Sequence, residues 1–151
     1  MPVSGREADP VEIGLRYLTL GHDLRKVVDD AMTAGGLSLA RTKVLQVLER
    51  RGALGQSALA RELGQAPRSV TQSVEALERE GLVERTPAPT DARSKLVRLT
   101  PQGTEALAAG TAAGERVLRQ VFGAMEPGRL RDLAQILGEL QAGVSGASGG
   151  R

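Results

Sequence analysis

The stretch PRSVTQS, residues 67–73, carries side chains of the kinds that read base edges in DNA. An arginine can donate two parallel hydrogen bonds to guanine, and a glutamine can pair in the same bidentate way with adenine. Arg68 and Gln72 supply these two types four residues apart. Short hydroxyls are better suited to phosphate oxygens, and the stretch holds three: Ser69, Thr71 and Ser73. The pattern indicates a DNA-binding surface, and its alternative is a polar helix face turned to solvent.

A second stretch, TDARSK at residues 90–95, places a carboxylate two residues before an arginine and a lysine two residues after it. A carboxylate can accept from a guanidinium and fix its direction. An arginine held at a hairpin tip can enter a minor groove, where narrow A·T tracts concentrate negative potential. We therefore interpret Arg93 as a groove contact, Asp91 as its orienter and Lys95 as a phosphate contact. The alternative is a turn capped by Asp91 with exposed charges.

The elements that must position these residues follow from the spacing of apolar side chains. Helical periodicity predicts helices over residues 11–34, 38–51, 56–63, 67–80, 101–122 and 127–140. Only Gly-Gln-Ala, residues 64–66, separates the third from the fourth, and two helices joined by such a turn have the form of a helix-turn-helix. In the fourth helix the residues at i, i+4 and i+7 should face the core: Val70, Val74 and Leu77. The polar side chains then cluster in its N-terminal half, where recognition helices contact bases.

Two short strands complete this region. Leu82–Arg85 and Lys95–Leu99 read as strands, and Pro87, Pro89 and Asp91 predict a loop between them rather than a tight two-residue hairpin. Ser38 and Thr100 are suited to cap the helices that follow them. The predicted fold is mainly α with a small β-hairpin wing: a winged helix-turn-helix flanked by long N- and C-terminal helices. The ends, residues 1–9 and 141–151, are expected to be frayed.

Composition narrows the function classes. The chain has 151 residues, 40% apolar and 25% charged, and no cysteine, which fits one globular domain without disulfides or thiol chemistry. We expect a cytoplasmic protein without a membrane segment. The basic excess is central, because residues 35–98 hold eleven basic and seven acidic side chains, a net of +4. Such a local excess is typical of phosphate contact, and its alternative is a solvated charged surface.

The flanking helices carry more apolar surface than one winged helix can cover. Ile13, Tyr17, Leu20, Leu24 and Val27 form a stripe on the first helix, and residues 130–140 form another. A symmetric homodimer would bury both stripes and place two recognition helices side by side. The alternative is that the stripes pack against each other within one chain.

The chain resembles the MarR family of bacterial transcriptional regulators over about residues 11–140. The resemblance rests on three stretches in the same order: SALARELG (57–64), PRSVTQSVEALEREGLVER (67–85) and TDARSKLVRLTPQG (90–103). It implies a dimeric DNA-binding protein in which the arginine of the D-x-R motif, here Arg93, enters the minor groove. It also implies a small anionic aromatic effector bound between the helical arms and the winged helix. His22 is then an effector contact or, more simply, a surface histidine, and Tyr17 is explained by its apolar stripe. Two positions depart from the family pattern: Ala66 lacks a capping side chain, and Gln72 stands where many relatives have a basic residue.

The expected protein is a homodimeric, sequence-specific regulator of double-stranded DNA that acts as a ligand-responsive repressor on an inverted repeat. We assign residues 1–151 to a single domain, 38–99 to the DNA-binding region, and 11–34 and 101–140 to the dimerisation arms. The alternative function is a winged helix used for protein–protein assembly. We expect no enzyme, cofactor or metal site, because the sequence shows no nucleophile–base pair, zinc-ligand spacing or phosphate-binding glycine loop.

Overall fold

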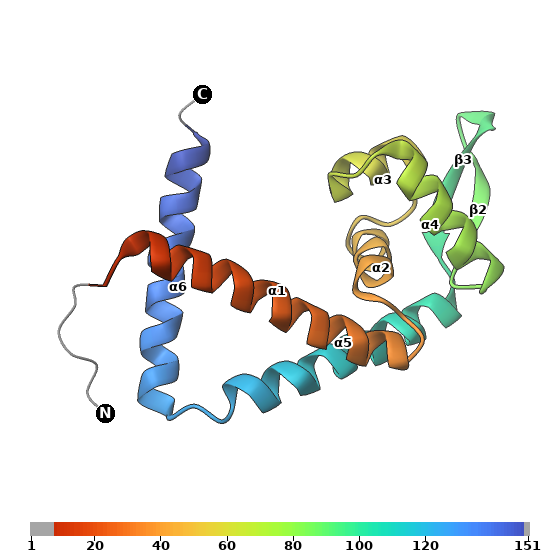
Figure 1. Cartoon of the computed structure of the whole chain (residues 1–151). Coiled ribbons are helices and arrows are strands. Elements are labelled where there is room, and N and C mark those ends of the chain that lie inside the picture. Colours follow the sequence, from red (N-terminus) through yellow and green to blue (C-terminus); the bar gives the residue numbers. More distant parts are fainter. Residues whose placement is uncertain (1–7, 150–151) are drawn as a thin grey trace. The chain divides into compact units, whose positions relative to one another are not determined.

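The computed structural model describes residues 8–149, shown in Figure 1. The chain forms two compact units, one ending at Gly114 and the other beginning at Glu115. None of the helices in the described range is long and apolar enough to cross a membrane.

Four helices of the first unit begin and end close to the predicted residues. They are α1 (Pro10–Ala34), α2 (Leu39–Arg51), α3 (Gln56–Leu63) and α4 (Pro67–Arg79). Side-chain caps explain two of the starts: Asp9 accepts from the N–H of Val11 at 3.0 Å, and Ser38 accepts from the N–H of Arg41 at 3.3 Å. Gly64 ends α3 with a φ of 61°, in the left-handed region that glycine tolerates. Residues 1–9 were predicted to be frayed, but Asp9 caps α1. Residues 1–7 lie outside the described part of the chain.

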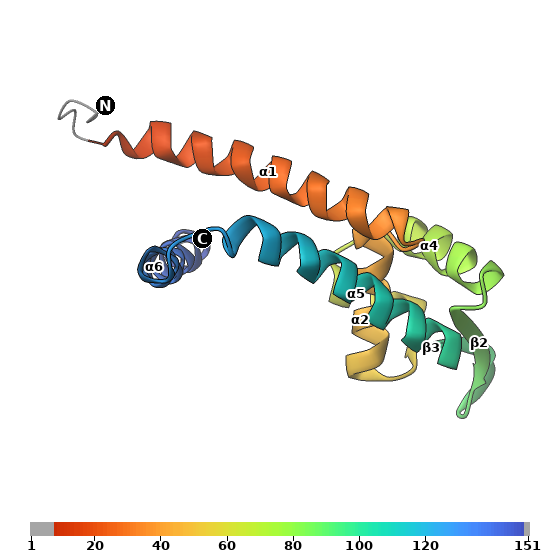
Figure 2. The same cartoon turned by 90° about the horizontal axis from the view of Figure 1, so that it is seen from below.

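The wing is a three-stranded antiparallel sheet. Its strands are β1 (Leu54–Gly55), β2 (Val83–Ala88) and β3 (Asp91–Leu99), in the order β1-β3-β2. Seen from below, the hairpin of β2 and β3 projects beyond the first turn of α5 (Pro101–Phe122) (Figure 2). β1 was not predicted, because its two residues are too few to show a periodicity.

The predicted loop between the two strands was wrong. Both strands extend further than expected, and only two residues, Pro89 and Thr90, connect them. The ladder is regular from Val83 opposite Leu99 to Pro87 opposite Lys95, and then slips, because Ala88 pairs with Asp91. Three extra residues of β3, residues 92–94, are thereby accommodated at the tip. Pro87 lies within β2, and Pro89 directly follows the last residue of that strand.

The base of the wing is held against the first turn of α5. The Thr100 hydroxyl accepts from the N–H of Gly103 at 3.0 Å, as the predicted cap requires, and donates to the carbonyl of Gly81 at 2.6 Å. A Cβ atom on Gly103 would lie only 1.9 Å from the carbonyl oxygen of Leu82. The turn between α4 and β2 therefore packs directly on α5, and only glycine fits at the contact.

The hydrophobic core lies beneath α4. The side chains predicted to face inward, Val70, Val74 and Leu77, are each 0% exposed. They pack with α2 residues such as Leu45 and with Val97 of β3. Because this face of α4 is fully used for packing, the opposite side of the helix is the part that remains available for binding.

The second unit contains the end of α5 and α6 (Pro127–Ser148). Glu126 caps α6, since its carboxylate accepts from the N–H groups of Gly128 and Arg129 at 2.8 and 3.1 Å. The prediction that residues 141–151 are frayed was wrong for 141–148, which continue the helix. The hydroxyls of Ser145 and Ser148 donate to backbone carbonyls four residues earlier. These two serines are therefore compatible with a helix, although the composition of residues 141–151 predicted a frayed end.

Candidate nucleic-acid interface

The N-terminal half of α4 presents the polar side chains expected of a recognition helix. Arg68, Ser69 and Gln72 are exposed, whereas Thr71 and Ser73 are half-buried. The helix begins at Pro67 after Ala66, whose backbone is extended but which provides no side-chain cap. The first N–H groups of α4 thus have no side-chain acceptor from their cap residue. They lie at the same end as the exposed arginine and are available to a phosphate.

Thr71 is tied to the preceding helix. Its hydroxyl lies 3.2 Å from Oε1 of Gln56, the first residue of α3, and 3.0 Å from the carbonyl of Pro67. A hydroxyl has one proton, so it donates to one of these oxygens at a time. Thr71 therefore helps to fix α4 on α3.

The wing tip places Arg93 and Lys95 on the surface, both exposed. The expectation that the Asp91 carboxylate would hold the Arg93 guanidinium was wrong. One oxygen of Asp91 accepts from the backbone N–H of Arg93 at 2.9 Å, and the other lies 3.3 Å from the hydroxyl of Ser94. Asp91 thus shapes the turn, which is the arrangement of the alternative interpretation.

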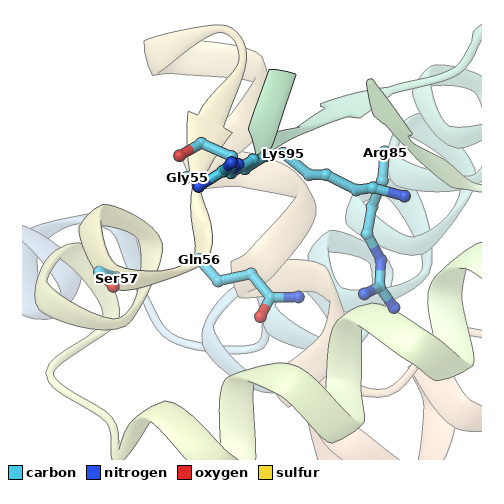
Figure 3. Close-up of a pocket in the computed structure, with 7 residues that line it drawn as sticks. Gly55, Gln56, Ser57, Arg85 and Lys95 are labelled. Atoms are coloured by element: carbon cyan, nitrogen blue, oxygen red, sulfur yellow. The ribbon is translucent and has the colours of Figure 1, made fainter. Parts of the chain in front are cut away.

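A shallow pocket of about 360 Å³ lies between the wing and the start of α3 (Figure 3). Its lining residues come from three segments: Gly55, Gln56, Ser57, Arg85, Arg93, Ser94 and Lys95. The structure therefore brings Arg93 and Lys95 together with a third cation, Arg85. Figure 3 shows the side chains of Gln56 and Arg85 both reaching toward α4.

Arg85 lies at the end of the strand predicted over residues 82–85, but it was not among the predicted site residues. Its Nε donates to Oε2 of Glu78 on α4 at 2.7 Å, and its side chain is only 26% exposed. Glu78 and Arg85 are seven residues apart in the sequence, and this spacing alone predicts no contact. The contact could be expected only if α4 were known to turn directly into β2. Elsewhere in the wing, Arg98 and Glu84 form an ion pair across the two strands.

A second pocket, of about 390 Å³, lies beside α1 and the start of α2. Its lining residues are His22, Arg25, Lys26, Asp29, Leu39, Ala40, Lys43 and Gln65. Asp29 accepts from the N–H of Leu39 at 2.8 Å and so joins the two helices. His22 lines this pocket, and Tyr17 is not among the lining residues. Among residues 8–149 no three His, Cys, Asp or Glu side chains form a group that could hold a metal ion.

These features define a winged helix-turn-helix protein, with an exposed recognition helix beside a cationic wing. The MarR family model matches residues 37–95, so the resemblance found in the sequence is confirmed over the winged helix. In this region the chain is similar to the DNA-binding transcriptional regulators of that family.

Individual relatives agree with this assignment. The chain is 28% identical over 110 residues to the HTH-type transcriptional regulator YdgJ of Bacillus subtilis, a match that covers 73% of this chain and 67% of the relative. It is 37% identical over 76 residues to a candidate transcriptional regulatory protein for the hcr operon of Thauera aromatica, covering 50% of this chain and 46% of that protein. The crystal structure of YusO from Bacillus subtilis has the same fold, with a TM-score of 0.79, 23% identity and coverage of 91% of this chain and 99% of that one.

Proposed function

We propose that the protein is a sequence-specific, double-stranded DNA-binding transcriptional regulator that acts as a homodimer on an inverted-repeat operator. The observation that carries the proposal is the division of α4 into two faces. Val70, Val74 and Leu77 are fully buried, while Arg68 and Gln72 are exposed near the helix start. Major-groove recognition needs this arrangement, because bases are contacted by the first turns of the helix.

The side chains divide into base contacts and phosphate contacts. Arg68 and Gln72 can form bidentate pairs with guanine and adenine. Ser69 and Ser73 are suited to phosphate, as is Lys95 on the wing, while Thr71 is placed by its contact with Gln56. Arg93 enters the minor groove, and Asp91 supports it by shaping the turn.

The apolar stripe of α1 supports a homodimer. Ile13, Tyr17, Leu20 and Val27 are each more than half exposed in the single chain. A run of large apolar side chains at this exposure is typical of an interface. Leu130, Ile136, Leu137 and Leu140 on α6 are also exposed. A two-fold dimer formed by these helices would present two copies of α4 to one operator.

We also propose that the protein is a repressor that acts in the cytoplasm and that a small anionic aromatic effector regulates it. The pocket beside α1 supports it, because four basic side chains line that pocket and only one acidic side chain does: His22, Arg25, Lys26 and Lys43 against Asp29. An effector can shift the equilibrium only if it binds one arrangement of the protein better than another. Loss of DNA affinity on adding such a ligand, reduced by Lys43→Ala, would support this role for the pocket.

The experiment that tests the function is binding of the purified protein to genomic DNA fragments, followed by isotherms on the selected duplex and on a shuffled one. Arg68→Ala should cost about 1–3 kcal/mol on the selected duplex and relax its base preference. Arg16→Ala, on an exposed part of α1, is the control and should bind as the parent does. Equal binding of both duplexes by the parent at all salt concentrations would contradict sequence-specific recognition.

A further inference from the structure

A carboxylate-held arginine does occur in this interface, at Arg85 rather than at the wing tip. The Nε of Arg85 donates to Glu78 at 2.7 Å. In the described part of the chain the two terminal nitrogens of this guanidinium have no hydrogen-bond partner, and the side chain lines the pocket between wing and α3. One edge of the planar group is therefore engaged by α4, and its other donors are available at the pocket.

We propose that Arg85 binds a DNA backbone phosphate in this pocket and that Glu78 is the positioning residue that directs it there. This rests on the proposed DNA-binding function and adds two residues to it. A guanidinium presents five donors in a fixed plane, so it can bind a carboxylate along one edge and a phosphate along another. Glu78 does not line the pocket.

The surroundings of Arg85 favour a phosphate as the occupant. Arg93 and Lys95 line the same pocket, so three cations share it with no acidic side chain. The pocket also opens at the start of α3, whose cap residue Gly55 offers no side-chain acceptor to the first N–H groups. It is continuous with the wing-tip residues assigned to DNA, so a duplex contacted by Arg93 would pass a phosphate close to Arg85.

Glu78 also links the recognition helix to the wing. Arg85 belongs to β2, and Glu78 lies at the C-terminal end of α4, on the helix whose first turns face the bases. The ion pair therefore fixes the phosphate contact relative to the base contacts. A phosphate contact held in register with the recognition helix positions that helix on the duplex without carrying sequence information itself.

The test measures dissociation constants over a salt series, on the selected duplex and a shuffled one. Arg85→Ala should weaken both by about 10- to 100-fold, as expected for a charge-assisted contact, and should lower the salt slope by about one unit. Arg85→Lys should keep the slope but lose part of the affinity, because an ammonium cannot hold carboxylate and phosphate along two edges. Arg98→Ala is the matched control, because it breaks another arginine–glutamate pair of the wing, Arg98–Glu84. Arg98 does not line the pocket, so this substitution should leave the salt slope unchanged.

Glu78→Ala, which removes the acceptor as well as the charge, distinguishes positioning from simple charge. In the parent it should weaken binding, because the arginine is no longer held, whereas in the Arg85→Ala background it should leave binding unchanged or slightly tighter. Tighter binding by the same factor in both backgrounds would overturn the positioning role. If the parent binds DNA with a steep salt dependence but Arg85→Ala keeps the parent's slope and affinity, the role of Arg85 is wrong and the proposed function still stands. If the parent itself shows no such binding, the proposed function fails. Urea unfolding of each variant confirms that the native fold is retained.

Discussion

Asp91 and Arg93 are joined through the backbone, because Oδ1 of Asp91 accepts from the N–H of Arg93 at 2.9 Å. The second oxygen of Asp91 lies close to the Ser94 hydroxyl, so both oxygens are used within the turn. The conformation of the wing tip therefore depends on an acceptor at position 91, and the negative charge there is not needed to hold the guanidinium.

Variants at position 91 separate these two roles. Asp91→Asn keeps the acceptor oxygen, so it should preserve the turn and bind DNA at least as tightly as the parent, since one negative charge is lost. Asp91→Ala removes the acceptor and should weaken binding by about 1 kcal/mol, the typical net value of such a hydrogen bond. Arg93→Ala should cost about 1–3 kcal/mol of binding and, as an exposed residue, change the free energy of unfolding by less than about 0.5 kcal/mol. Fluorescence anisotropy measures these effects, and equal losses for Asn and Ala would contradict this account of the turn.

The uncapped start of α4 predicts a substitution that stabilises the fold. Ala66 has an extended backbone, with φ −64° and ψ 140°, but no side-chain acceptor. Ala66→Ser and Ala66→Asp should each raise the free energy of unfolding by about 1 kcal/mol. Only the aspartate should weaken DNA binding, because it places a negative charge where a phosphate is expected. Urea unfolding and DNA titration together check this; a serine variant that loses stability would show that the N–H groups are already satisfied.

The contact between α5 and the base of the wing predicts a large loss of stability. Gly103→Ala would place a Cβ 1.9 Å from the Leu82 carbonyl oxygen, and the cost should be about 3 kcal/mol, because backbone must move. The matched control is Gly138→Ala in α6, where no atom lies within 4 Å of the added Cβ. That substitution should instead stabilise the protein by about 0.5–1 kcal/mol, through helix propensity. If the two substitutions changed the free energy of unfolding by denaturant to a similar extent, the close approach at Gly103 would not exist.

The proposed dimer can be tested on α1. Leu20 is 64% exposed in the single chain, so in a dimer formed by the apolar stripe Leu20→Glu would bury an unpaired charge. The variant should be monomeric at micromolar concentration, whereas the parent should sediment as a dimer. Asp23→Lys changes the charge of an exposed residue on the same helix and should remain dimeric. Sedimentation velocity decides between these outcomes, and a monomeric parent would exclude this interface.

The helices could be predicted from sequence because their signals are local. The buried stripe of Val70, Val74 and Leu77 recurs at helical spacing, and the ends of α2 and α3 are fixed by Ser38 and Gly64, whose effects need no tertiary context. The exposure of Arg68 and Gln72 follows directly from that stripe. Local patterns therefore predicted the recognition helix and most of its candidate contacts.

What could not be predicted depends on contacts between elements. The two residues of β1 are strand only because Leu54 pairs with Val97. Arg85 reaches Glu78 only because β2 turns back along α4. At the wing tip, the D-x-R spacing allows the carboxylate of Asp91 to bind either the guanidinium of Arg93 or the backbone of the turn. With the register slipped beyond Pro87, the carboxylate binds the backbone. In each case the sequence allows the chemistry, and tertiary pairing decides which partner is used.

Footprinting on selected genomic fragments tests most directly whether α4 and the wing read DNA as one half of a two-fold assembly. We expect an inverted repeat with half-sites about one helical turn apart and a protected length of roughly 15–25 base pairs. Arg68→Ala and Gln72→Ala should remove protection of both half-sites together. Protection of a single unrepeated half-site, or no protected sequence at salt concentrations where the parent still binds DNA, would contradict this expectation.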